Sequence, residues 1–152
     1  MDDAHTARLT EQWGLTADAQ RALLSRLRPR TASVEFVVRP RTGAPEPLAD
    51  LLAPFAPAST IGVGRRPGYP RPEPEAVVLV CRTQRSLFAL LADIGLFTVE
   101  PSPHGDHITP TALGTADLGF FDADGRLLCA VVTHEGLVFA DAALLTTHET
   151  AN

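Results

Sequence analysis

The chain has 152 residues, of which 45% are apolar and 20% are charged, and its formal net charge is −5. This size and balance exclude a disordered chain and predict one folded domain, residues 1–152, with its own apolar core. No apolar run approaches the roughly 18 residues that a membrane-spanning helix needs, so we expect no membrane partner.

All 13 basic residues are arginine. The absence of lysine excludes Schiff-base chemistry, pyridoxal chemistry and the Walker-type phosphate loop, since each requires a lysine. The same arginine bias, together with abundant alanine and proline, is typical of a GC-rich, bacterial-like composition.

The two ends of the sequence differ in charge. Residues 1–42 contain seven arginines and five acidic residues, a net charge of +2, whereas residues 99–152 contain one arginine and eight acidic residues, a net charge of −7. Because affinity for phosphate depends on a basic face, this balance argues against a nucleic-acid partner, and an acidic face is suited to a basic partner. The basic residues concentrate between Arg21 and Arg41, a stretch that contains six arginines and a single acidic residue, Glu35.

The N-terminal sequence and the cysteines both favour the cytoplasm. The chain begins with acidic and polar residues, unlike a secretory signal. Cys81 and Cys129 fall in apolar strand-like runs, where we expect buried free thiols rather than a disulfide. We therefore expect a cytoplasmic protein.

In chain order, the first elements predict a helical hairpin. A first helix is expected from Asp2 to Trp13, with Gly14 as its stop. Thr16 is suited to cap a second helix, whose leucines recur at helical spacing until Pro29 ends it. We expect this hairpin to lie on a sheet.

Two strand–helix–strand patterns follow. In the first, apolar and polar residues alternate over Ser33–Arg39, a short helix is expected from Pro47, and Ser59–Val63 is a strand candidate. In the second, the apolar run Ala76–Val80 precedes a leucine-rich helix, and Leu96–Val99 resumes as a strand.

The caps of that second helix are also predicted. Thr83 is expected to cap its start and Gly95 to end it. Two βαβ units in series predict an α+β fold with a mixed sheet, of the split arrangement known from ferredoxin-like sandwiches.

The remaining segments predict a long loop and a meander. The stretch Gly64–Pro74 has four prolines and two glycines, so it is expected to be a surface loop, either a connector or a binding element. Residues 102–117 are expected to be irregular. Three strands, 118–121, 126–133 and 137–140, are then predicted to form an antiparallel meander with turns at Gly125 and Gly136.

Two sets of residues suggest chemistry. His104, Asp106 and His107, with the distant His134, are the residue types of a metal site made of imidazoles and a carboxylate. Cys81 precedes a predicted helix and lies near two arginines, Arg82 and Arg85, a setting that lowers a thiol pKa and is typical of a nucleophile. Neither set is complete enough in sequence to identify a reaction, and no cofactor is expected.

Interaction residues are predicted in the long loop. Arg65, Arg66, Tyr69 and Arg71 are expected to be exposed, and tyrosine and arginine are enriched where interfaces concentrate their binding energy. We therefore predict a small cytoplasmic protein-interaction module, such as an adaptor, regulatory subunit or immunity-type inhibitor.

Two other classes of function stay open on the sequence alone. One is a small metal- or cysteine-dependent enzyme, and the other is a regulator that binds a ligand or nucleic acid through the arginines between Arg21 and Arg41. Besides a protein partner, a second copy of the chain is a candidate for self-association.

Overall fold

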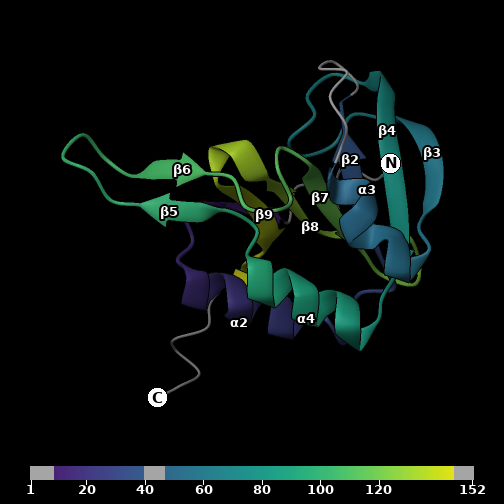
Figure 1. The fold of residues 1–152 in the computed structure, drawn as a ribbon, viewed down its shortest axis with the longest axis horizontal. Helices are drawn as coiled ribbons and strands as arrows, with labels where there is room; N and C mark the ends of the chain where they lie inside the picture. Colours follow the sequence, from purple (N-terminus) through teal and green to yellow (C-terminus); the bar gives the residue numbers. More distant parts are fainter. Residues whose placement is uncertain (1–8, 40–46, 146–152) are drawn as a thin grey trace.

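The computed structural model describes residues 9–39 and 47–145, and within them the fold is α+β (Figure 1). A seven-stranded sheet carries the fold, and each pair of neighbouring strands in it is antiparallel. In spatial order its strands are β1 (Leu9–Trp13), β9 (Leu137–Asp141), β8 (Leu127–Val132), β7 (Asp117–Phe121), β2 (Ser33–Val38), β4 (Glu73–Arg82) and β3 (Ala58–Val63).

The helices pack against one face of this sheet, where the main core lies (Figure 1). They contribute leucines that meet inward-pointing residues of the strands, such as Phe36 of β2 and Phe120 of β7, both 0% exposed. None of the described helices is long and apolar enough to cross a membrane. The helices are α2 (Ala17–Leu27), α3 (Pro47–Leu52), α4 (Arg85–Ile94) and α5 (Ala142–Leu145), with short 3₁₀ turns η1 (Ala53–Phe55) and η2 (Thr133–Glu135).

Helix α2 forms where the sequence predicts it. The hydroxyl oxygen of Thr16 accepts a hydrogen bond from the backbone N–H of Ala19 at 3.2 Å, which caps the first turn. Leu23, Leu24 and Leu27 recur on one side and are almost fully buried. Spacing and cap therefore specify this helix locally.

Helix α4 is also confirmed, but its predicted N-terminal cap is wrong. The capping position is occupied by Gln84, which makes no side-chain capping hydrogen bond, and the Thr83 hydroxyl lies one residue too early. Gly95 ends the helix as predicted, at φ +83°, and its N–H donates to the carbonyl oxygen of Leu91 at 2.9 Å.

The predicted first helix is wrong over residues 9–13, which form strand β1; the rest of that predicted helix lies outside the described residues. Leu9 and Trp13 are four apart, as in a helix, but both pair with β9, opposite Asp141 and Leu137. The partner strand, β9, lies more than 120 residues further along the sequence, so no pattern within residues 9–13 could predict this pairing. The helical hairpin is therefore replaced by a strand followed by α2.

The mixed sheet predicted from βαβ units is also corrected, because the described strands pair antiparallel throughout. Helix α3 connects β2 to β3, yet β4 lies between these two strands. Likewise α4 follows β4, and the chain returns to the sheet as β7, on the far side of β2.

Between α4 and β7 the chain forms a separate two-stranded ribbon that projects from the body (Figure 1). Strand β5 (Thr98–Glu100) pairs with β6 (His107–Thr109), so β5 does not join β4, and part of the segment expected to be irregular is a strand. Ile108 anchors the ribbon, since a Cβ added at Gly136 would lie 2.6 Å from the Ile108 side chain.

The C-terminal meander is confirmed. Strands β7, β8 and β9 are consecutive neighbours in the sheet, and the two glycines at their turns, Gly125 and Gly136, have φ of +81° and +64°. Asp122 organises the first turn, because its Oδ1 accepts hydrogen bonds from the backbone N–H groups of Asp124 and Arg126, each at 2.9 Å.

Candidate functional site

Within the described chain, the buried residues of the helices all belong to the main core, and the second face of the sheet is partly covered by residues 64–72, which we call the Tyr69 loop. Arg66, Pro67, Gly68 and Tyr69 form its turn: the backbone N–H of each end donates to the carbonyl oxygen of the other, at 3.0 and 2.7 Å. Proline followed by glycine at positive φ is the signature of a type II turn, and Gly68 has φ +88°. A Cβ at Gly68 would also lie 3.0 Å from Val132, so the loop approaches β8 closely.

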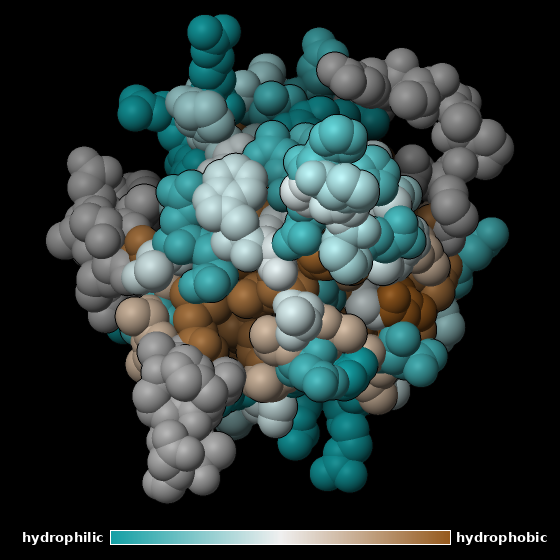
Figure 2. Space-filling model, turned by 90° about the vertical axis from the view of Figure 1, so that its left-hand side faces the viewer, coloured by the Kyte–Doolittle hydropathy of each residue, from teal (hydrophilic) through white to brown (hydrophobic). Residues whose placement is uncertain are grey.

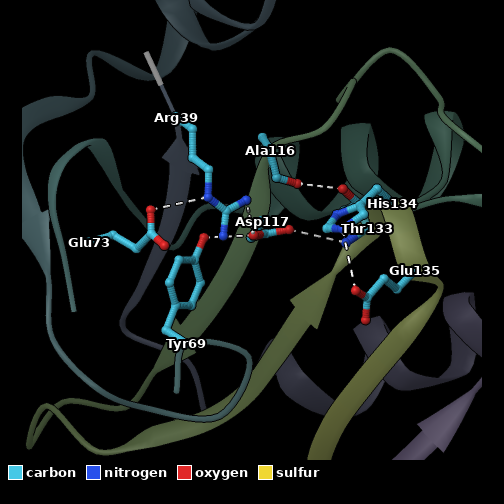
Figure 3. A network of polar contacts seen from close by, with 8 residues as sticks. All are labelled: Arg39, Tyr69, Glu73, Ala116, Asp117, Thr133, His134 and Glu135. Carbon is cyan, nitrogen blue, oxygen red and sulfur yellow. Dashed lines mark hydrogen bonds and ion pairs between the residues drawn. The ribbon is translucent and has the colours of Figure 1, made fainter. Parts of the chain in front are cut away.

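Tyr69 points inward and fixes the loop to the sheet (Figure 3). It is 3% exposed and packs with Val37, Val63, Ala76 and Val78 in a small second core. The expectation that Tyr69 is exposed is therefore wrong. Its ring is large and apolar, and a partner for its hydroxyl exists on the sheet, so burial is favourable.

That partner is Asp117, the first residue of β7, which is 1% exposed (Figure 3). The Tyr69 hydroxyl donates to Asp117 Oδ2 at 2.6 Å, and the backbone N–H of Thr133 donates to Oδ1 at 3.3 Å. The Arg39 guanidinium lies 3.6 Å from Oδ2 and also donates to Glu73 at 3.3 Å. These donors suit an ionised carboxylate, so the buried charge is compensated.

The same contacts set the pKa values. Burial raises the pKa of Asp117 above its usual range, and the surrounding donors oppose that rise. Burial, together with the neighbouring carboxylate, raises the pKa of Tyr69, so its hydroxyl stays protonated and continues to donate. Asp117 and Tyr69 are therefore partners in a structural lock rather than a free base and a free nucleophile.

Arginine side chains enclose this lock. The guanidinium carbons of Arg39 and Arg66 lie 5.1 and 5.6 Å from the centre of the Tyr69 ring, within cation–π range. Arg66 also lies 5.5 Å from the centre of the Phe121 ring and donates to Glu35 at 2.8 Å. Since both arginines are already paired with carboxylates, neither offers an uncompensated positive charge to a phosphate.

Beside the lock lies an open cleft of about 670 Å³. The Tyr69 loop forms one wall and strands β8 and β9 form the floor, with Phe139 partly exposed in it. His134 and Glu135 stand at the rim, with Nε2 and Oε2 3.5 Å apart (Figure 3). We call this space the loop cleft; its lining residues are Arg39, Arg66, Pro67, Gly68, Pro70, Val132, His134, Glu135, Leu137 and Phe139.

The pairing of β1 with β9 shows that the apolar surface continues from the loop cleft onto β1. Trp13 pairs with Leu137 and Glu11 pairs with Phe139, and directly opposite residues of an antiparallel pair share a face. Trp13 therefore lies on the same face as the floor of the loop cleft. It is 57% exposed, although its indole N–H donates to Glu11 at 3.1 Å.

A second cleft, of about 400 Å³, lies on the helix side, between the start of α2, the end of α4 and β5. Figure 2 faces this side of the molecule and shows a hollow with apolar side chains at its floor. Gln20 is buried beside it and holds its walls together: its side-chain N–H groups donate to the carbonyl oxygens of Leu15 and Phe97, and its oxygen accepts from the N–H of Leu96. Every polar atom of that amide is thus engaged within the protein.

The predicted metal residues are not assembled into a site. His104 and Asp106 lie in the turn of the β5–β6 ribbon, and His107 begins β6, all exposed, whereas His134 lies on η2. Over residues 9–39 and 47–145, no group of three or more histidine, cysteine, aspartate or glutamate side chains is placed to hold a metal ion. Asp106 lines the second cleft instead.

Cys81 is buried rather than reactive. It is 0% exposed in the main core, and burial raises its pKa, which is the opposite of the shift that the nucleophile hypothesis requires. Cys129 is also fully buried, its pKa is likewise raised by burial, and both thiols are free. The core position of Cys81 on β4 outweighs the nearby arginines, because Arg82 and Arg85 are exposed to solvent.

The arginines between residues 21 and 41 do not form one face. Arg21 pairs with Asp18 on the same helix, and Arg26 donates to the carbonyl oxygen of Leu144 at 3.3 Å. Arg39 belongs to the Asp117 network on the other side of the sheet, and Arg41 lies outside the described residues. A shallow groove between α2 and α4 does bring Arg21 and Arg28 together with a further arginine, Arg85.

Of the predicted loop residues, Arg65 and Arg71 are exposed, whereas Arg66 is paired with Glu35 and Tyr69 is hydrogen-bonded to Asp117. Sequence reasoning missed Asp117, Arg39 and Glu73, the residues that hold Tyr69. A proline–glycine turn next to a tyrosine was a visible signal for an ordered loop. The identity of its partner was not visible, since Asp117 is 48 residues away in the chain.

Comparison with known proteins adds no relative: no protein-family model, no curated protein and no solved structure matches this chain.

Proposed function

We propose that the chain is a protein-interaction module that docks a partner segment across the loop cleft and the adjoining Trp13. The observation that carries this proposal is an exposed tryptophan beside an apolar floor, next to a loop wall fixed in advance by the Tyr69–Asp117 hydrogen bond. A surface ordered before binding loses less conformational entropy when the partner arrives.

The chemistry of the loop cleft supports binding rather than reaction. Its arginines are paired with carboxylates, the buried Asp117 carboxylate beside it is occupied by donors, and His134 lies against Glu135. Tryptophan is among the residue types that concentrate interface energy. Arg65 and Arg71, at the exposed edges of the loop, are the two loop residues predicted from the sequence that are available for contact.

The experiment compares capture of a partner by the wild type, Trp13→Ala and Ile61→Ala. Trp13 and Ile61 are the two exposed large apolar residues of the described chain, and each lies on an edge strand, so Ile61→Ala is a matched control. An interface hot spot contributes at least about 2 kcal/mol, or more than tenfold in affinity. We expect a defined protein to be recovered by the wild type and Ile61→Ala and at least tenfold less by Trp13→Ala, with the purified pair repeating this order in calorimetry. Equal recovery by all three, or no recovery, refutes the proposal.

We further propose that strands β7, β2, β4 and β3 with helices α3 and α4 correspond to a ferredoxin-like core. The order β7-β2-β4-β3, the antiparallel pairing, and the two helical connections that each skip one strand support this assignment. The β5–β6 ribbon is then an insertion before the last core strand, and β8, β9 and β1 extend the sheet. The cytoplasmic location remains a prediction.

A further inference from the structure

Strand β3 forms one edge of the seven-stranded sheet, beside β4 (Figure 1). Residues 58–61 are all exposed, and Ile61 at 72% is the more exposed of the two large apolar residues noted above. A free edge presents backbone N–H and C=O groups to any other strand, so proteins usually protect such edges with charged residues, proline or a bulge.

The protection of this edge is slight. From Leu51 to Gly64 the sequence contains no charged residue, over α3's last turn, η1 and the whole of β3. Its prolines, Pro54 and Pro57, precede the strand, and the register shift between Ile61 and Val63 comes only at its end. The segment between them is uncharged and contains β-branched residues, which favours strand pairing.

The opposite edge is different. Strand β1 carries Glu11 at its centre, and Glu11 accepts a hydrogen bond from Trp13. Antiparallel pairing of β1 with a second β1 would bring two glutamates close together, and like charges at facing positions destabilise a strand pair. The β1 edge therefore carries a charge that opposes pairing with its own copy, and the β3 edge carries none.

We propose that β3 pairs antiparallel with β3 of a second copy of this chain, across a two-fold axis. Facing residues must lie on the same side of the continuous sheet, so the axis passes beside one residue. We place that axis at Thr60, because an axis at Ser59 would set Pro57, which has no N–H, opposite Ile61 of the second chain. Thr60 then faces its own copy, and Ser59 faces Ile61 of the second chain.

This pairing continues the sheet from one chain into the next and covers the exposed isoleucine. The neutral surface of η1, next to β3, adds contact without introducing repulsion. A strand pair this short buries less than the roughly 800 Å² per partner of a standard stable interface, so we expect reversible dimers that dissociate on dilution. The inference is independent of the loop cleft, because the free edge of β3 is not part of it and the floor of the cleft is formed by β8 and β9.

The first test is sedimentation velocity of the full chain over a series of concentrations. We expect the wild type to shift from monomer toward dimer as concentration rises. Ile61→Lys places two positive charges near each other at the axis, and we expect at least a tenfold weaker dimer. Gln12→Lys makes the same kind of change at the β1 edge and should leave the dimer constant unchanged. A wild type that stays monomeric throughout, or equal effects of the two lysines, overturns the proposal.

The second test locates the axis. Directly opposite residues of an antiparallel pair have Cα atoms about 4.5–5.5 Å apart, within disulfide range. Thr60→Cys should therefore form a covalent dimer under mild oxidation, whereas Gln12→Cys should not. The native Cys81 and Cys129 do not interfere, since both are 0% exposed. Failure of Thr60→Cys to link faster than Gln12→Cys contradicts the proposed pairing.

Discussion

The hydrogen bond from Tyr69 to Asp117 gives the sharpest prediction for stability. Tyr69→Phe removes one hydroxyl and keeps the ring, so the packing with Val78 and the nearby guanidinium groups is retained. The change leaves a buried carboxylate without its shortest donor, at 2.6 Å. Hydrogen bonds to charged groups contribute about 1.5–3 kcal/mol. We expect the free energy of unfolding to fall by about 2 kcal/mol at neutral pH.

The loss should depend on pH. Burial raises the pKa of Asp117, so this group stabilises the fold most at acid pH, and that contribution declines as pH rises through the raised pKa. The Tyr69 hydrogen bond lowers the pKa and so limits the decline. Without the hydroxyl the decline is steeper, and the deficit of Tyr69→Phe should be largest at neutral pH and smaller near about pH 4, close to the unfolded pKa of an aspartate.

Urea denaturation of wild type, Tyr69→Phe, Asp117→Asn and the double variant at both pH values measures these effects. In the Asp117→Asn background no ionised carboxylate is left at this position, so removal of the hydroxyl should cost only about 1 kcal/mol, as for a neutral hydrogen bond. A deficit of Tyr69→Phe below about 0.5 kcal/mol at neutral pH, or one that does not change with pH, would refute this account of the lock.

Three further predictions concern other parts of the fold. Gln20→Ala removes three hydrogen bonds to backbone groups, two of them buried and one partly buried, and should lower the free energy of unfolding by about 2–4 kcal/mol in urea denaturation; a change under about 1 kcal/mol, as for a surface residue, would contradict it. Gly136→Ala strains a positive φ and meets Ile108, so it should lower the thermal midpoint, and Ile108→Ala should recover part of the loss; no recovery would mean that the backbone alone is responsible. Cys81 and Cys129 should react with a thiol reagent only as fast as the protein unfolds, and fast labelling in native buffer would show that the core opens locally.

Elements with strong local signals were predictable from the sequence. The cap at Thr16, the leucine spacing of α2 and α4, and the glycine turns of the meander each specify their element within a few residues. These are the features that depend on backbone geometry and side-chain periodicity rather than on distant partners.

Elements with distant partners were not predictable in this way. Strand β1 has the residue spacing of a short helix and becomes a strand because β9 supplies the hydrogen bonds. The direction of the sheet was misjudged because β4, which lies between β2 and β3, comes after both of them in the chain. An apolar run such as Ala76–Val80 fits a buried antiparallel strand as well as a parallel one.

The candidate site shows the same limit. The Tyr69 loop and its arginines were predicted from the sequence as interaction residues. The direction of the Tyr69 side chain was not, because it depends on Asp117, which stands at the start of an apolar strand with no sequence signal for this contact. The histidines were singled out by residue type, but His104, Asp106 and His107 lie on the β5–β6 ribbon and His134 on η2, and among the described residues they form no group that could hold a metal ion. Residue type suggests chemistry, and only the topology decides which residues meet.

The partnership between β1 and β9 has a consequence for synthesis of the chain. Leu9 finds Asp141 only after nearly all of the intervening polypeptide has emerged from the ribosome. Until then β1 has no neighbour, and its backbone hydrogen-bonding groups stay available to chaperones and proteases. Completion of this border strand is therefore expected to be a late step of folding, and the indole fluorescence of Trp13 is a natural reporter of it.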